Sequence, residues 1–129
     1  MKPLLLLVLV ALAAPVSAQP RVILRLAQIN AITAPTADVW TTLASNDNPS
    51  LVEKNPLVRR ADGTADPVRT IGLTAGYVAL NLTILRLAWS KELDDAKGLR
   101  WLATGVVVAL NALNWRAAVN NYRLDRRLR

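Results

Sequence analysis

The chain has 129 residues, of which 53% are hydrophobic and 19% charged, and its formal net charge is +7. It contains neither cysteine nor histidine, which excludes disulfides, thiol catalysis, iron–sulfur clusters and histidine-dependent catalytic or metal sites. The apolar residues are gathered in blocks rather than spread at core spacing. We therefore expect an all-α membrane protein with a single membrane domain over 19–129.

Residues 1–18 are typical of a secretory signal peptide. Lys2 supplies the positive start, an apolar run of 11 residues follows over 4–14, and Val16-Ser17-Ala18 gives the small residues that a signal peptidase reads. We expect cleavage after Ala18; the alternative is a retained anchor. In both cases residue 19 lies outside the cytoplasm.

Residues 22–45 are long enough to cross a bilayer but are interrupted by polar residues. Asp38 near a helix centre costs about 2.5 to 3.5 kcal/mol of insertion free energy, and Pro35 is expected to kink or divide the helix. We predict a first crossing that packs on the following helices. The alternative is an amphipathic helix on the outer surface.

Two apolar arms over 71–89 and 101–119 predict an antiparallel transmembrane hairpin. Each arm has 19 residues, or about 28 Å of helix, which is close to the hydrocarbon thickness of a bilayer. Gly72 and Gly76 are four residues apart, and Gly105 begins a similar row of small residues in the last arm. Such rows let helix backbones approach closely, so these three glycines are predicted to pack helices.

Basic residues set the predicted orientation. The 46–69 connection and the segment from 116 onward together hold nine lysines and arginines, whereas the opposite side holds four to six. This difference predicts that the connection and the C-terminus lie in the cytoplasm. This predicts a multi-pass protein of the bacterial inner membrane with its mature N-terminus outside. The basic tail over 120–129 is expected to contact anionic lipid headgroups rather than nucleic acid.

Placing the three helices side by side brings several polar side chains to a common depth in the inner half of the bilayer. Ionisable residues in a membrane usually face the bundle interior and have partners, which predicts a buried polar cluster. Either Arg116 or Tyr77 is expected to reach into it. This cluster either fixes helix register by hydrogen bonding or uses Asp38 as a proton or cation site. The candidate members are Asp38, Thr42, Asn111, Asn114 and Arg116.

The segments Asp38-Val-Trp-Thr41-Thr42 and Glu53-Lys-Asn55-Pro56-Leu57, followed by two apolar helices, form a recognisable combination. It resembles a family of small bacterial membrane proteins with no assigned activity and a D-x-x-T-T … E-x-N-P-L signature, over roughly residues 30–119. The resemblance implies three crossings, with Asp38, Thr42, Glu53, Asn55 and Pro56 as characteristic positions. If the resemblance holds, Glu53 and Asn55 cap or brace the inner ends of the helices beside Asp38. The alternative is that Asn55-Pro56 is only a turn and that Glu53 and Lys54 form a solvated pair.

No catalytic, cofactor-binding or metal-binding residues are predicted, because the chain offers no acid pair within the bilayer and no phosphate-binding loop. We expect a non-enzymatic membrane protein that assembles with itself or with a membrane partner through its small-residue rows. The alternative is a small transport or ion-coupling component that uses Asp38.

Overall fold

The computed structural model describes residues 19–91 and 95–128, and the predicted signal peptide over 1–18 lies outside them. Within these ranges the chain forms three long α-helices, one short 3-10 helix and no strand, so the predicted all-helical class is confirmed. The long helices are α2 (Gln19–Ala44), α3 (Pro67–Ala88) and α4 (Lys97–Leu128), and η1 (Ser45–Asp47) extends α2.

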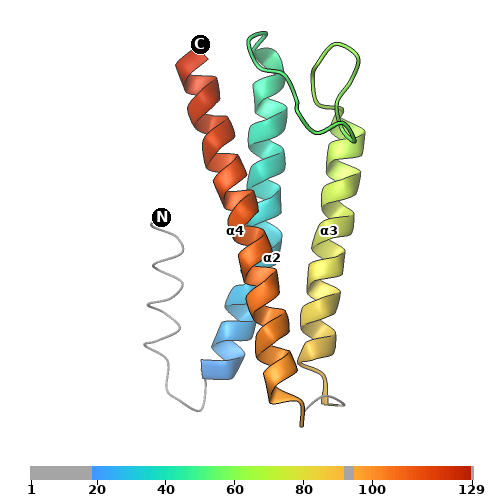
Figure 1. Cartoon of the computed structure of the whole chain (residues 1–129), viewed down its shortest axis with the longest axis vertical. Coiled ribbons are helices and arrows are strands. Elements are labelled where there is room, and N and C mark those ends of the chain that lie inside the picture. Colours follow the sequence, from blue (N-terminus) through green and yellow to red (C-terminus); the bar gives the residue numbers. More distant parts are fainter. Residues whose placement is uncertain (1–18, 92–94, 129) are drawn as a thin grey trace.

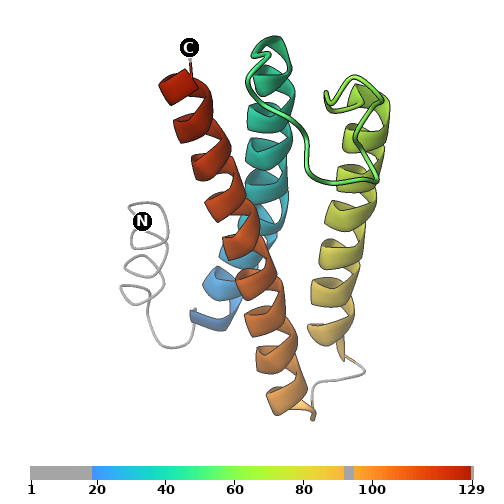
Figure 2. The ribbon, with the colours of Figure 1, turned by 45° about the horizontal axis from the view of Figure 1, so that its top comes forward.

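The three helices lie side by side, with α2 and α4 running in the same direction and α3 running against them (Figure 1). The same arrangement is visible after rotation of the molecule (Figure 2). The connection between α2 and α3 and the C-terminus lie at one end of the bundle, which we call the loop end. The short connection between α3 and α4 lies at the opposite end, which we call the hairpin end.

Local sequence explains where the helices begin and continue. Asp66 caps α3 by accepting a hydrogen bond from the Arg69 N–H at 3.0 Å, and Pro67 occupies the first turn, where no N–H is needed. Pro35 lies inside α2, which continues through it as one helix. The expected division of this helix at Pro35 therefore does not occur.

The bundle buries small and polar residues and exposes large apolar ones. Its core cluster consists of Ala27 and Ala31 from α2, Leu85 from α3 and Val107 from α4, each at most 2% exposed. Buried among the helices are also three asparagines and two threonines: Asn30, Asn81, Asn111, Thr70 and Thr104. By contrast Leu80 is 59% exposed, Leu102 65% and Leu113 61%. This is the reverse of the usual arrangement in a water-soluble helical bundle.

Helices α3 and α4 are long and apolar enough to cross a membrane. The structure thus supports two of the three predicted crossings by length and composition. Helix α2 packs against both, and most extensively against α4, although α2 is not among the helices that are apolar enough to cross a membrane by themselves.

Candidate functional site

A cavity of about 450 Å³, lined by both polar and apolar residues, lies between the three helices near the loop end. Helix α2 contributes Asp38 and Thr42, α3 contributes Tyr77, and α4 contributes Asn114 and Asn121. The α2–α3 connection closes the remaining side with Glu53, Asn55, Leu57 and Val58. We call this space the inner cavity.

Asn121 joins α4 to α2 at the wall of the inner cavity. Its side-chain NH₂ donates to the Asp38 carboxylate at 3.3 Å and to the Thr42 hydroxyl at 3.1 Å. A single amide thereby bridges two groups that stand one helical turn apart on α2. This contact fixes the register between α2 and α4 at the loop end.

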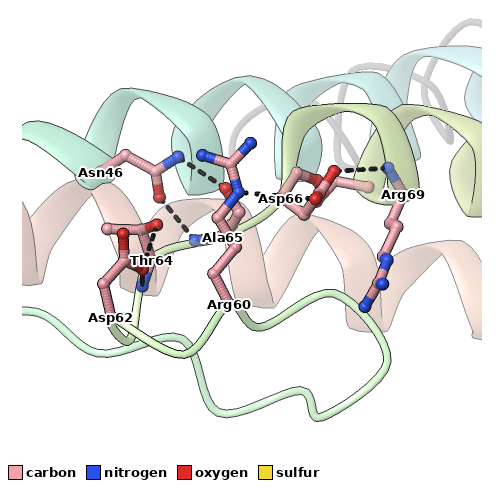
Figure 3. Close-up of polar contacts among 8 residues, drawn as sticks. Asn46, Arg60, Asp62, Thr64, Ala65, Asp66 and Arg69 are labelled. Atoms are coloured by element: carbon pink, nitrogen blue, oxygen red, sulfur yellow. Dashed lines mark hydrogen bonds and ion pairs between the residues drawn. The ribbon is translucent and has the colours of Figure 1, made fainter.

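The α2–α3 connection is held in place by Asn46, in η1. Its amide donates to the Ala65 carbonyl at 2.9 Å and accepts from the Ala65 N–H at 2.8 Å, as Figure 3 shows. A side chain thus pairs with both backbone groups of a residue that is only 1% exposed. A second tie runs from Asn48 to the Asp125 carboxylate on α4 at 3.2 Å.

Hydrogen bonds within the connection orient its carboxylates. Glu53 accepts from the Asn55 N–H at 2.7 Å, and the Glu53 N–H donates to the Gly63 carbonyl at 2.8 Å. Gly63 has a φ of +87°, a left-handed conformation that glycine adopts without steric cost. A Cβ at this position would approach the Val52 side chain to 3.3 Å, so both backbone shape and space favour glycine there.

Two carboxylates outside the cavity are stabilised in their charged form. Hydrogen bonds from the side chain and backbone of Thr64 lower the pKa of Asp62 (Figure 3). The backbone N–H of Arg69 lowers the pKa of Asp66, and Arg60 adds to this effect through its 3.4 Å ion pair. These contacts rigidify the turn that leads into α3.

The inner cavity is acidic. Asp38 and Glu53 are its only charged lining residues, and neither forms an ion pair within the described residues. This is notable in a chain with 16 lysines and arginines. No group of three or more potential His, Cys, Asp or Glu metal ligands gathers anywhere in 19–91 or 95–128.

A second cavity of about 440 Å³ lies beside the first, between the connection and the end of α4. We call it the outer cavity. The two share Thr42, Glu53 and Asn121 as lining residues. The hydrogen bond between Asn121 and Thr42 therefore lies at the boundary between the two spaces.

Beyond the inner cavity, towards the middle of the bundle, lie three buried asparagines, one from each helix. Asn111 accepts from Asn114 at 3.4 Å and donates to the Val107 carbonyl at 2.7 Å. Asn30 accepts from the Trp115 indole at 2.9 Å. The side-chain nitrogen of Asn81 is buried and has no hydrogen-bond partner within 19–91 and 95–128.

The structure brings some of the predicted site residues together and leaves others apart. Asp38, Thr42 and Asn114 line one cavity, together with Glu53 and Asn55 of the predicted loop motif. Asn111 lies one turn deeper and is bonded to Asn114. Arg116 is exposed and does not line the cavity, whereas Tyr77 does. Pro56 is exposed and borders a separate shallow hollow.

The glycines predicted to pack helices do not pack against another helix among the described residues. A Cβ built at Gly72, Gly76 or Gly105 would meet nothing within 4 Å. Close approach between the helices uses the alanines of α2 instead, with Ala31 and Ala34 fully buried. The three glycines are exposed on the outward faces of the bundle that residues 19–91 and 95–128 form.

Asn121 was not among the predicted site residues. It falls just after the apolar arm that ends at 119, in the segment predicted as a tail, but α4 continues to Leu128. A helical continuation of α4 would have placed Asn114 and Asn121 two turns apart on the same face, since seven residues span about two turns.

Comparison with known protein families, curated proteins and solved structures found no match to this chain.

Proposed function

We propose that the chain is a non-enzymatic protein of the bacterial inner membrane that crosses the bilayer three times and assembles there with a second copy or a membrane partner. The observation that carries this proposal is the reversed polarity of the bundle. The helices bury asparagines on their inner sides and expose leucines on their outer sides. This arrangement suits hydrocarbon surroundings and is unfavourable in water.

Hydroxyl groups along α2 and η1 support a crossing by α2. Thr33, Thr36 and Thr41 of α2 and Ser45 of η1 each donate to a carbonyl one turn earlier, at 2.7 to 3.0 Å. Polar groups in lipid must find partners inside the segment, and these four do. Asn30 and Asp38 accept hydrogen bonds from side chains of α4, the Trp115 indole and the Asn121 amide.

In the proposed orientation, residues 1–18 direct export, the hairpin end faces outward and the loop end faces the cytoplasm. The basic residues of the α2–α3 connection and of the last turns of α4 then lie on the side that the positive-inside rule requires. The arginines that end α4, Arg126 and Arg127 among them, lie at the level of anionic headgroups. Each adds about 1 kcal/mol of attraction to such a surface.

Assembly is proposed through the outward face of α3. Gly72 and Gly76 lie on this face with free space above them, and Val68 and Leu80, one turn before and after them, are more than half exposed. Without large side chains at the two glycines, a second helix can approach to backbone contact.

The test is the oligomeric state of the full chain in lipid, measured by energy transfer between labelled copies over a range of protein-to-lipid ratios. Gly76→Leu should weaken association about tenfold or more, equivalent to about 1.4 kcal/mol. Gly98→Leu is the matched control, because Gly98 also has free space around it but lies at the start of α4. A monomeric parent chain, or equal association of both variants and the parent, contradicts assembly through this face.

A second candidate function is transport or ion coupling, with Asp38 as the charged site. It is favoured by the inner cavity, in which Asp38 is joined by a second carboxylate from the connection. The test is uptake of protons or potassium into vesicles that contain the full chain. Asp38→Asn should abolish a flux that Asp47→Asn leaves intact, since Asp47 is exposed and lines neither cavity.

A further inference from the structure

We propose that the inner cavity binds a small organic ammonium ion, a protonated primary amine with a short alkyl chain. This inference rests on the second candidate function and specifies the class of ligand for that site. It is independent of assembly through α3.

The first argument is charge. Two carboxylates from different elements, Asp38 and Glu53, line a common space without a basic lining residue. Buried or partly buried charges are usually paired, and a bound cation supplies the missing partner. An anion would meet two like charges there and be repelled.

The second argument is the size and character of the walls. A volume of about 450 Å³ falls in the range of small-molecule sites and exceeds what a bare ion occupies. Ca²⁺ and Mg²⁺ take about six or more close oxygen ligands, whereas roughly half of this lining is apolar, with Val39, Leu57 and Leu73 among its members. An alkyl chain attached to a cationic head matches both parts of the wall.

The third argument is hydrogen bonding. A primary ammonium group has three N–H donors, and the cavity offers acceptors in its two carboxylates and in the amide and hydroxyl oxygens of Asn114 and Thr74. The Tyr77 ring lines the same space and adds the possibility of a cation–π contact, which favours organic ammonium ions.

The fourth argument is access. Leu57 and Leu73, which line the inner cavity, are 66% and 50% exposed, so the cavity is open to the outside of the bundle. Towards the hairpin end, the core cluster of Ala27, Ala31, Leu85 and Val107 is closed to solvent.

The experiment is isothermal titration calorimetry of the full chain in detergent with n-butylammonium, n-butanol and potassium ion at constant ionic strength. We expect n-butylammonium to bind, and the uncharged isostere n-butanol to bind at least about tenfold more weakly, a difference of about 1.4 kcal/mol. Asp38→Asn and Glu53→Gln should each lower the affinity for n-butylammonium by about tenfold or more. Asp47→Asn removes the same charge outside both cavities and should leave the affinity within about twofold.

Circular dichroism establishes that each variant is folded, and Glu53→Gln lies in the connection, where it does not interrupt a helix. Equal binding of n-butylammonium and n-butanol, or equal affinities in the parent chain and both cavity variants, overturns the proposal. Binding of potassium alone, with loss in Asp38→Asn, overturns the amine class but retains the cation site. No binding of either cation overturns both.

Discussion

Asn46 is predicted to hold the α2–α3 connection against the bundle, and its removal should loosen that connection without melting the helices. Asn46→Ala deletes the bonds of 2.9 and 2.8 Å to Ala65 and leaves the N–H and carbonyl of a residue that is only 1% exposed without partners. Each group left unpaired costs about 1 to 3 kcal/mol, and partial access of water reduces the sum. We therefore expect the free energy of opening of the connection to fall by about 2 to 4 kcal/mol.

Hydrogen exchange at the Ala65 amide, followed by mass spectrometry of the full chain in detergent, measures this opening. A loss of about 2 to 4 kcal/mol corresponds to roughly 30- to 1,000-fold faster exchange. Asn46→Asp keeps the acceptor for the Ala65 N–H and loses the donor, so its effect should be intermediate. Asp47→Ala alters the exposed neighbouring residue and serves as the control. Unchanged exchange in Asn46→Ala would refute the assigned role of this side chain.

Three further predictions concern the helices. The Arg69 N–H lowers the pKa of Asp66, so the charged cap stabilises α3 fully above the usual aspartate pKa of about 3.9. This stabilisation is lost as the pH falls through the lowered pKa. The rate of amide exchange in the first turn of α3, relative to the intrinsic rate at each pH, should therefore rise with acid in the parent chain and stay flat in Asp66→Asn. Asn81→Leu removes a buried donor that has no partner among the described residues. The free energy of unfolding in detergent should therefore stay unchanged or rise by about 1 to 3 kcal/mol. A decrease of that size would mean that the amide has a partner. Trp115→Phe breaks the 2.9 Å bond to Asn30 and should cost about 1 kcal/mol in the same assay; an unchanged unfolding midpoint would contradict the contribution of this bond.

The sequence was sufficient for the helical class and for the hairpin, because two uninterrupted apolar arms leave few alternatives. It was insufficient for α2. Arg25, Pro35 and Asp38 make this segment ambiguous by hydropathy. In the structure it lies against α4, where Asn30 and Asp38 pair with residues more than 80 positions away. Such pairings follow from packing and are not visible in local sequence.

The cavity was predicted in part. Matching the depths of antiparallel helices brought Asp38, Thr42 and Asn114 to the same region, since depth depends only on the rise per residue. Rotation about each helix axis is a separate variable, and it turned Arg116 outward and Asn121 inward. The end of an apolar arm also marks where lipid contact ends and gives no information on where a helix ends, which is why the last turns of α4 were assigned to a tail.

The rows of small residues also show that helix rotation could not be predicted from the sequence. Rows of small residues four apart occur in α2, α3 and α4, and each satisfies the requirement for close helix approach. The structure uses the alanines of α2 inside the bundle and leaves the glycines of α3 and α4 on outward faces. Which row is internal depends on how all three helices are rotated together.

The central claim, a bundle that crosses the bilayer three times, is tested most directly by the accessibility of single cysteines, for which this cysteine-free chain provides a clean background. Arg21→Cys, Ser50→Cys and Ser90→Cys are each treated with a membrane-impermeant maleimide before and after the membrane is opened. We predict that Arg21→Cys and Ser90→Cys react in intact spheroplasts and that Ser50→Cys reacts only after opening. Reaction of both Arg21→Cys and Ser50→Cys in intact spheroplasts would place both ends of α2 on the outside and contradict the three-crossing bundle.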